Sequence, residues 1–149
     1  MKNLSAIAAV VVGSLLLLAG MISCSKTTEA PAVPNSQLVV GKWNINRMQL
    51  KLYYAGIFAK DTIIPQTPKP ENFVRFDAAG NFEYRFNTST SDNGTYQFNG
   101  ADSIISTSAS RTYRWKILTL YSFLFTMMNT STSPDFPGAT VETYYTLVH

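Results

Sequence analysis

Few side chains in this sequence could perform nucleophilic, acid–base or metal chemistry. The 149 residues include one cysteine, Cys24, and one histidine, His149, which is the last residue. A chain end is a poor place for a catalytic base or a metal ligand, because such a group must be held in a fixed geometry. A nucleophilic serine would have no other histidine as its partner, and there is no glycine-rich phosphate loop. The sequence therefore predicts a protein that is not an enzyme and that takes no cofactor and no metal.

Charged residues are sparse and of mixed sign. Lys and Arg together number 12 and Asp and Glu number 9, which gives a formal net charge of +3 at pH 7. Nucleic acids are bound by a concentrated basic footprint, and this sequence has no run of Lys or Arg, so no nucleic-acid partner is expected. Asp77 and Glu83 flank a predicted hairpin, and we interpret these two carboxylates as a charged rim.

The cysteine stands at the end of a long apolar run. After Lys2, residues 4–22 carry no ionisable side chain. This is the layout of a secretory signal peptide. The run is also close to the roughly 18 residues at which a membrane-spanning helix becomes credible, so an uncleaved helix is the alternative.

The tetrapeptide Met21-Ile22-Ser23-Cys24 resembles a bacterial lipobox, in which an apolar residue, a small residue and a cysteine mark a cleavage point. In that family the thiol receives a diacylglycerol and the cysteine becomes the new N-terminus. The resemblance implies a lipoprotein signal peptide at residues 1–23 and acyl chains, such as palmitate, held through Cys24. It places the protein in the cell envelope, anchored to the outer membrane without spanning it. With that thiol occupied, no disulfide can form.

The remaining chain divides into a tether and one domain. Residues 25–37 are polar, contain proline and show no periodicity, so residues 24–37 are predicted to be the lipidated cysteine and a flexible tether. Residues 38–149 are long enough for one domain with its own core and too short for two.

Apolar residues alternate with polar ones along most of this domain. The clearest case is Phe82, Tyr84 and Phe86, which alternate with charged or amide side chains, the pattern of a half-buried strand. Asn99-Gly100 is a strong hairpin turn signal. No convincing amphipathic helix is present. We predict eight or nine strands, at residues 39–54, 57–64, 73–76, 82–86, 95–98, 103–107, 113–118, 123–127 and 141–147.

This order predicts an all-β fold, an antiparallel up-and-down meander. A meander of so many strands must protect its edges, and closure into a barrel does this most completely. The alternative is a two-sheet β-sandwich, which strand count alone does not exclude.

The start of the first predicted strand, Gly41-Lys42-Trp43, resembles the Gly-x-Trp motif of lipocalins, whose tryptophan fills the closed end of the barrel. The strand rhythm of residues 38–149 is similar to that of lipocalin-like lipoproteins of the Bacteroidetes. In lipocalins a basic residue of the last strand stacks on the tryptophan, and residues 141–147 contain none. Arg111 and Arg114, from an earlier strand, are the candidates to replace it.

Two functions follow from this resemblance and from the pattern of residues. A lipocalin-like barrel implies binding of a small apolar or amphipathic ligand, although an eight-stranded barrel is equally able to be filled by its own side chains. The alternative is a non-enzymatic lipoprotein with a filled core that binds or inhibits an envelope protein. Its contact surface would be the hairpin 47–64, with Tyr53, Tyr54 and Phe58 at the tip.

Two triplets resemble sites at which Bacteroidetes attach O-glycans to exported proteins. They are Asp61-Thr62-Ile63 and Asp102-Ser103-Ile104, and the resemblance implies modification of Thr62 and Ser103. Turn chemistry explains the second triplet equally well.

Overall fold

The computed structural model of the protein describes residues 32–65, 69–87, 90–133 and 137–149. The chain divides into two compact units, and the second, Val33–His149, contains the strands. It includes a single-turn helix, α2 (Asn35–Leu38), whose Leu38 packs against the hydrophobic core. The predicted signal segment and Cys24 lie outside the described residues. Within the described residues, no helix has the length and apolar character needed to cross a membrane.

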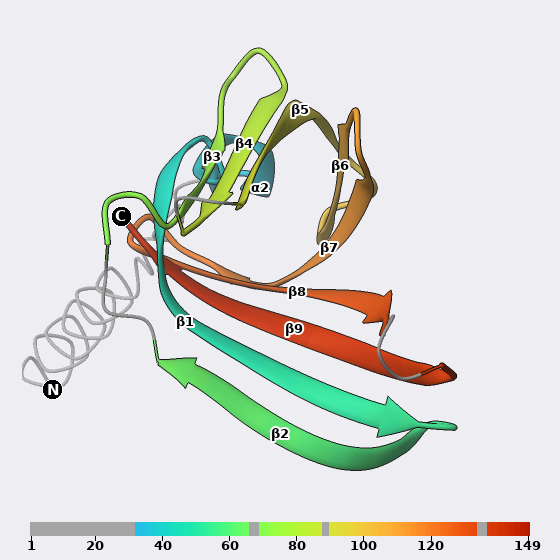
Figure 1. Ribbon diagram of the computed structural model, residues 1–149. Coiled ribbons are helices and arrows are strands. Elements are labelled where there is room, and N and C mark those ends of the chain that lie inside the picture. Colours follow the sequence, from blue (N-terminus) through green and yellow to red (C-terminus); the bar gives the residue numbers. More distant parts are fainter. Residues whose placement is uncertain (1–31, 66–68, 88–89, 134–136) are drawn as a thin grey trace, which may run out of the picture. The chain divides into compact units, whose positions relative to one another are not determined.

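Nine antiparallel strands follow one another along the second unit (Figure 1). They are β1 (Gly41–Tyr54), β2 (Ile57–Pro65), β3 (Phe73–Phe76), β4 (Asn81–Phe86), β5 (Thr90–Phe98), β6 (Ser103–Ser108), β7 (Thr112–Leu120), β8 (Leu124–Thr132) and β9 (Ala139–Val148). The order is β2-β1-β3-β4-β5-β6-β7-β8-β9, and β1 also pairs with β9. The strands β1 and β3–β9 therefore close into an eight-stranded barrel, with β2 outside it. The predicted all-β meander and closed barrel are confirmed, and the sandwich alternative is excluded by the closure.

Strand β1 is long enough to belong both to the barrel wall and to a sheet that extends beyond the barrel. Residues 41–44 pair with β3 and so belong to the barrel wall, whereas residues 47–54 pair with β2 instead. Along almost the whole of this length, β9 pairs with the other edge of β1. The far halves of these strands leave the barrel as an open sheet (Figure 1). We call this the projecting sheet, made of β2 with residues 49–54, 129–132 and 139–144.

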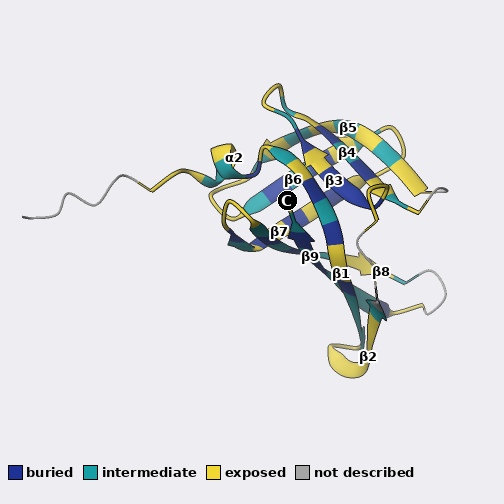
Figure 2. Ribbon diagram, turned by 90° about the vertical axis from the view of Figure 1, so that its left-hand side faces the viewer, coloured by how far each residue is buried: buried dark blue, intermediate teal, exposed yellow. Residues whose placement is uncertain are grey.

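Large side chains fill the interior of the barrel. The largest fully buried ones include Trp43, Trp115, Phe76 and Phe125, and Figure 2 shows the buried positions along the barrel strands, with β2 mostly exposed. Most large apolar residues of the predicted strands lie in this core: Phe82, Tyr84, Trp115, Phe125 and Met127 are buried and Phe86 packs against them. Phe123 is an exception. It lies in the turn before β8 and is 67% exposed.

Several strand boundaries differ from the sequence prediction, including the end of β8, which was expected at residue 127 and lies at Thr132. Val39 and Val40 were expected to open the first strand, but they follow α2, where the Val39 N–H donates to the Asn35 carbonyl. Strand β5 begins at Thr90, earlier than expected, because its polar first half pairs with β4 through backbone hydrogen bonds. Backbone pairing does not require apolar side chains, so hydrophobic alternation missed this half of the strand.

Candidate ligand site at the open end of the barrel

The antiparallel strands give the barrel two different ends. The start of β1, helix α2 and the turns 77–80, 99–102 and 121–123 lie at one end, which we call the plugged end. A hydrogen bond from Asn35 Nδ2 to the Ala101 carbonyl (2.8 Å) holds α2 there. The turn 109–111 and the projecting sheet lie at the other end, the open end.

Trp43 seals the plugged end. Its Nε1–H donates to the Val39 carbonyl at 2.8 Å, and its ring meets Phe125 edge-to-face with centroids 5.5 Å apart. The His149 imidazole covers the tryptophan, with ring centroids 4.0 Å apart. These contacts leave no part of Trp43 exposed to solvent.

Gly41 makes room for that histidine. Its φ of +148° lies in a region that side chains disfavour, and a Cβ built there would stand 2.6 Å from His149 Cε1. The Gly-x-Trp motif therefore has a physical explanation here. The tryptophan fills the barrel end, and the glycine leaves space for the ring that lies over it.

Neither arginine proposed for this stacking position occupies it. Arg111 lies at the open end, with its Nε 3.7 Å from Asp92 Oδ2, and Arg114 is exposed on the outer face of β7. His149 takes the position instead. An aromatic ring directly after the last strand was the available signal, but a single residue outside the strands forms no pattern.

Tyrosines line the barrel interior next to the open end. Tyr84, Tyr113 and Tyr145 are buried, with ring centroids 6.0 Å apart for the first two and 6.4 Å apart for Tyr84 and Tyr145. Tyr113 stacks on Trp115 at 5.0 Å. Burial raises the pKa of Tyr145 well above its ordinary value, and the neighbouring Tyr84 adds to this shift, so the hydroxyl stays neutral.

One carboxylate ties the strands together at this end. Asp92 Oδ2 accepts hydrogen bonds from Tyr113 (3.0 Å), Ser108 (3.0 Å) and Ser110 (3.2 Å), and Arg111 lies beside it. Burial raises the pKa of Asp92, but the hydroxyl hydrogen bonds outweigh burial and leave this pKa below its ordinary value. Oδ2 thus links β5 to the β6–β7 hairpin, whereas Oδ1 accepts a hydrogen bond from the Asn93 N–H (3.0 Å).

Strand register creates an apolar surface beyond these tyrosines. Directly paired residues of antiparallel strands share a face of the sheet. Thr62 pairs with Leu50, Leu50 with Thr143, and Thr143 with Asn129, so one row crosses all four strands of the projecting sheet. The next row outward consists of Lys60, Leu52, Val141 and Ser131. This face continues the inner face of the barrel wall, because Met48 and Tyr145 in the adjacent row are buried core residues.

A hollow of about 250 Å³ lies on this inner face. We call it the shelf; it is lined by Leu50, Leu52, Lys60, Thr62, Ile64, Ser133 and Val141. Its floor is made by four aliphatic side chains that are only half-buried. Sites for drug-sized ligands span roughly 300–1,000 Å³, so the shelf suits an alkyl segment or a small ring.

An unsatisfied acceptor lies at the barrel side of the shelf. Among the residues that the structure describes, Asn129 Oδ1 is a buried side-chain oxygen with no hydrogen-bond partner. Leaving such a group unpaired costs about 1–3 kcal/mol, so it normally has a reason. Asn129 lies between Trp115 and Thr143 in the row that continues to Leu50. Asn129 is not among the residues that line the shelf, and in this row Thr143 separates it from Leu50.

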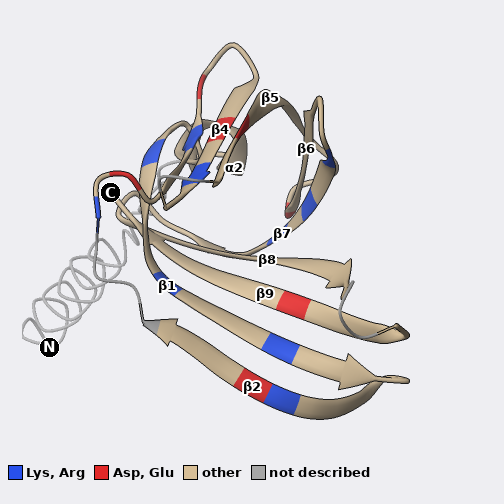
Figure 3. Cartoon of the chain, in the orientation of Figure 1, with Lys and Arg blue, Asp and Glu red and all other residues tan. Residues whose placement is uncertain are grey.

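The charges of the projecting sheet are divided between its two faces. Lys60 lies at the shelf, whereas Asp61 and Glu142 are on the outer face, where Asp61 accepts a hydrogen bond from Gln49 (2.7 Å) and Glu142 accepts one from Tyr144 (2.7 Å). The described part of the inner face carries no carboxylate. Over the barrel, charges of both signs are scattered along the strands (Figure 3).

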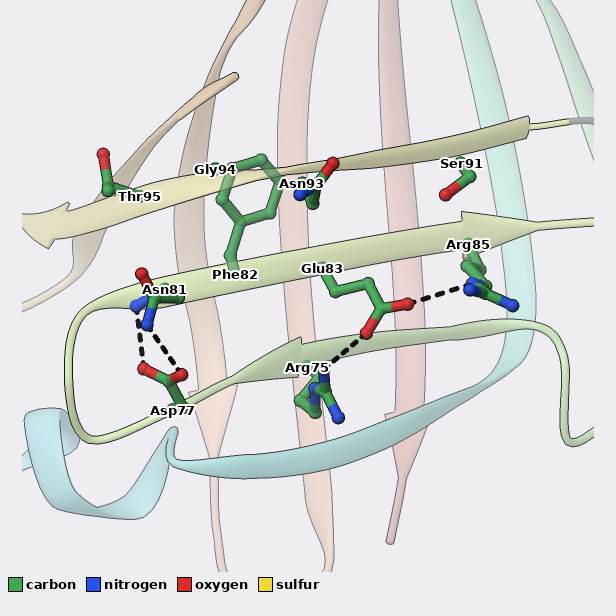
Figure 4. A pocket seen from close by; sticks show the side chains of 10 residues that line it. All are labelled: Arg75, Asp77, Asn81, Phe82, Glu83, Arg85, Ser91, Asn93, Gly94 and Thr95. Atoms are coloured by element: carbon green, nitrogen blue, oxygen red, sulfur yellow. Dashed lines mark hydrogen bonds and ion pairs between the residues drawn. The ribbon is translucent and has the colours of Figure 1, made fainter. Parts of the chain in front are cut away.

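A second, polar hollow of about 690 Å³ lies on the outer face of β3, β4 and β5. Glu83 is held between Arg75 (2.7 Å) and Arg85 (2.9 Å), and Asp77 accepts hydrogen bonds from Asn81, which lower the pKa of Asp77 (Figure 4). Each carboxylate thus has its own partners, and Asp77 and Glu83 do not form an acid–base pair. This geometry is that of a charged, solvated surface.

The other residues singled out in the sequence fall in different places. Thr62 is exposed at the edge of the shelf. Ser103 is half-buried at the start of β6, where its hydroxyl donates to the Trp115 carbonyl at 3.2 Å. At the tip of the β1–β2 hairpin, Tyr53 and Phe58 pack edge-to-face on the outer face, with centroids 5.9 Å apart.

No protein-family model matches this chain, and no curated protein is significantly similar to it.

Proposed function

We propose that the protein is a lipocalin-like lipoprotein of the cell envelope, anchored to the outer membrane through a lipid on Cys24, that binds a small apolar or amphipathic ligand at the shelf. The observation that carries the binding proposal is the half-buried aliphatic floor of Leu50, Leu52, Ile64 and Val141. The unpaired Asn129 oxygen lies two strands from Leu50 in the same row.

The proposed ligand site lies at the rim of the barrel and not in its interior. Trp43 and Trp115 occupy the interior together with Phe76 and Phe125, so a bound molecule would have to displace well-packed core. The shelf requires no such displacement. It also offers the pairing typical of ligand sites, an apolar surface with a few polar groups that fix orientation.

Native mass spectrometry of residues 33–149, the compact unit, tests this function. The protein is incubated with a mixed lipid and metabolite extract and sprayed without detergent. We expect a reproducible added mass that disappears under denaturing conditions. The double variant Leu52→Ser/Val141→Ser should lose this mass, because it removes half of the aliphatic floor.

Leu118→Ser is the matched control, since Leu118 is an exposed leucine on the outer face of β7, away from the shelf. It should keep the added mass. A bare polypeptide mass for the unaltered protein would contradict ligand binding, and equal uptake by all three proteins would contradict the shelf as the site.

A second function, binding of an envelope protein, is favoured by the surface of β2. This strand pairs on one side only, and Ile57 (72%), Phe58 (55%) and Ile63 (51%) are exposed on it. A photo-crosslinking amino acid at Phe58, compared with one at Leu118, tests this in intact cells. One partner captured at Phe58 and absent at Leu118 would support the second function over the first.

A further inference from the structure

We propose that the turn 121–123 at the plugged end of the barrel is seated in the headgroup region of the bilayer that holds the lipid anchor. This inference rests on the proposed lipid at Cys24. The plugged end would then face the membrane, and the shelf, at the opposite end of the barrel, would face away from it.

The turn presents two large aromatic side chains to solvent. Tyr121 is 57% exposed and Phe123 is 67% exposed, and their rings stack with centroids 6.2 Å apart. The turn itself is closed by the backbone, through a hydrogen bond from the Tyr121 N–H to the Leu124 carbonyl (2.8 Å). Neither ring belongs to the hydrophobic core. The fold therefore does not explain why these two residues are aromatic.

The turn lies at the end of the barrel where the chain enters. Leu124 pairs with Val148, which also pairs with Asn44 near the start of β1, so the turn is close to that start. The compact unit begins at Val33, and helix α2 packs at this same end. Val33 and Val40, on either side of α2, are also exposed, at 53% and 37%.

The length of chain before the domain limits how far this end can be from the membrane. Nine residue steps separate Cys24 from Val33, and each spans at most about 3.3–3.6 Å, so the plugged end stays within about 30 Å of the anchor. Strand β7 has nine residues and is therefore roughly 30 Å long, so the open end lies roughly 30 Å from the plugged end. The plugged end is the end to which the preceding chain is joined, so it is the end that we place toward the bilayer.

A bilayer fits this patch better than a protein does. Tyrosine favours the membrane–water interface, where its ring is buried and its hydroxyl stays hydrated. Phenylalanine is among the apolar residues that interfacial segments bury at the same depth. Stable protein interfaces bury about 1,200–2,000 Å², far more than two rings and two valines can supply. Two rings suffice at a membrane because the acyl chains already provide the attachment and the second contact only orients the domain.

The test uses the full-length protein, purified from membranes and reconstituted into phosphatidylethanolamine–phosphatidylglycerol vesicles. Intact mass first shows whether Cys24 carries the lipid. A new cysteine at Ser122→Cys, the free thiol once Cys24 is acylated, is labelled with an environment-sensitive fluorophore. The matched control is Ala59→Cys, on the exposed β2 at the other end of the domain.

We expect the fluorescence emission of the label at residue 122 to shift to the blue on the vesicles. We also expect this emission to be quenched when the vesicles contain a lipid spin-labelled at headgroup depth. The label at residue 59 should show neither effect. Tyr121→Ser/Phe123→Ser, placed in the Ser122→Cys protein, should abolish the shift and the quenching. Ile57→Ser/Phe58→Ser, the matched loss of two apolar side chains at the other end, should not.

The outcomes separate the two proposals. A lipidated protein with no quenching at 122, or with equal quenching at 122 and 59, would overturn the seating of the turn and leave the anchor intact. A mass without lipid on Cys24 would overturn both. Capture of 122 by a protein in intact cells, without quenching in vesicles, would show that the aromatic turn serves a protein partner.

Discussion

The two ends of the barrel are built for different purposes. At the plugged end, Phe125 and His149 each contact Trp43, and Trp43 and Phe125 are fully buried. At the open end, the projecting sheet leaves Leu50 and Val141 half-buried and one amide oxygen unpaired. Side chains are therefore more fully buried at the plugged end, and the binding surface that we propose lies at the open end.

Truncation of one large side chain at each end should give the largest contrast. Trp43→Ala removes a fully buried indole and should lower the free energy of unfolding by about 4 kcal/mol. Leu52→Ala, on the half-buried shelf, should cost about 1 kcal/mol. Urea unfolding of the compact unit measures both values. Equal losses would contradict the division between the two ends.

Gly41→Val should be the next most damaging change, at about 3 kcal/mol. It combines an unfavourable φ with a side chain that would collide with the His149 ring. Gly100→Val is the control, because Gly100 also has a positive φ but has open space around it, and it should cost about 1 kcal/mol. His149→Ala in the Gly41→Val background should restore part of the loss. No restoration would mean that His149 does not occupy the space beside Gly41.

At the open end, one substitution should raise stability and lower binding together. Asn129→Leu removes the unpaired buried oxygen and should increase the free energy of unfolding by about 1 kcal/mol. The same change should weaken retention of the ligand in native mass spectrometry. Destabilisation by Asn129→Leu would show that the oxygen has a partner in solution and is not held open for a ligand.

The pH dependence of stability should contain a smaller contribution from Asp92. Its pKa in the folded protein lies below the ordinary value of about 3.9, so the ionised carboxylate stabilises the fold above that pH. This contribution is lost as the pH falls through the lowered pKa. Urea unfolding between pH 2 and 6 should therefore show a weaker acid dependence for Asp92→Asn, and Tyr113→Phe should give an intermediate result. An unchanged profile for Asp92→Asn would contradict the assigned pKa shift.

Features that depend on local sequence patterns could be predicted, whereas features that depend on which strands pair could not. Alternation such as that of Phe82, Tyr84 and Phe86 is local, so the strands were predictable, and the need to cover their edges predicted the closed barrel. The position of β2 outside the barrel was not predictable, because a continuous strand gives no sign of where its partner changes from β3 to β2.

The site depends on distances between strands that the sequence does not contain. Trp43 and Gly41 were recognisable as a motif, but the partner that covers them, His149, follows the last strand and had no pattern of its own. Asn129, Leu50 and Thr62 become neighbours only through strand register. Ligand binding was expected inside the barrel, and the filled interior moves the proposed site to the shelf.

Methyl NMR of the compact unit tests the central claim most directly. Spectra of isoleucine, leucine and valine methyl groups are recorded as sodium laurate, a small amphipathic probe, is added. We predict shifts for Leu50, Leu52, Ile64 and Val141 on the shelf, and unchanged signals for Ile104 and Leu147 in the core. Shifts confined to Ile104 and Leu147 would place the ligand inside the barrel and contradict the account.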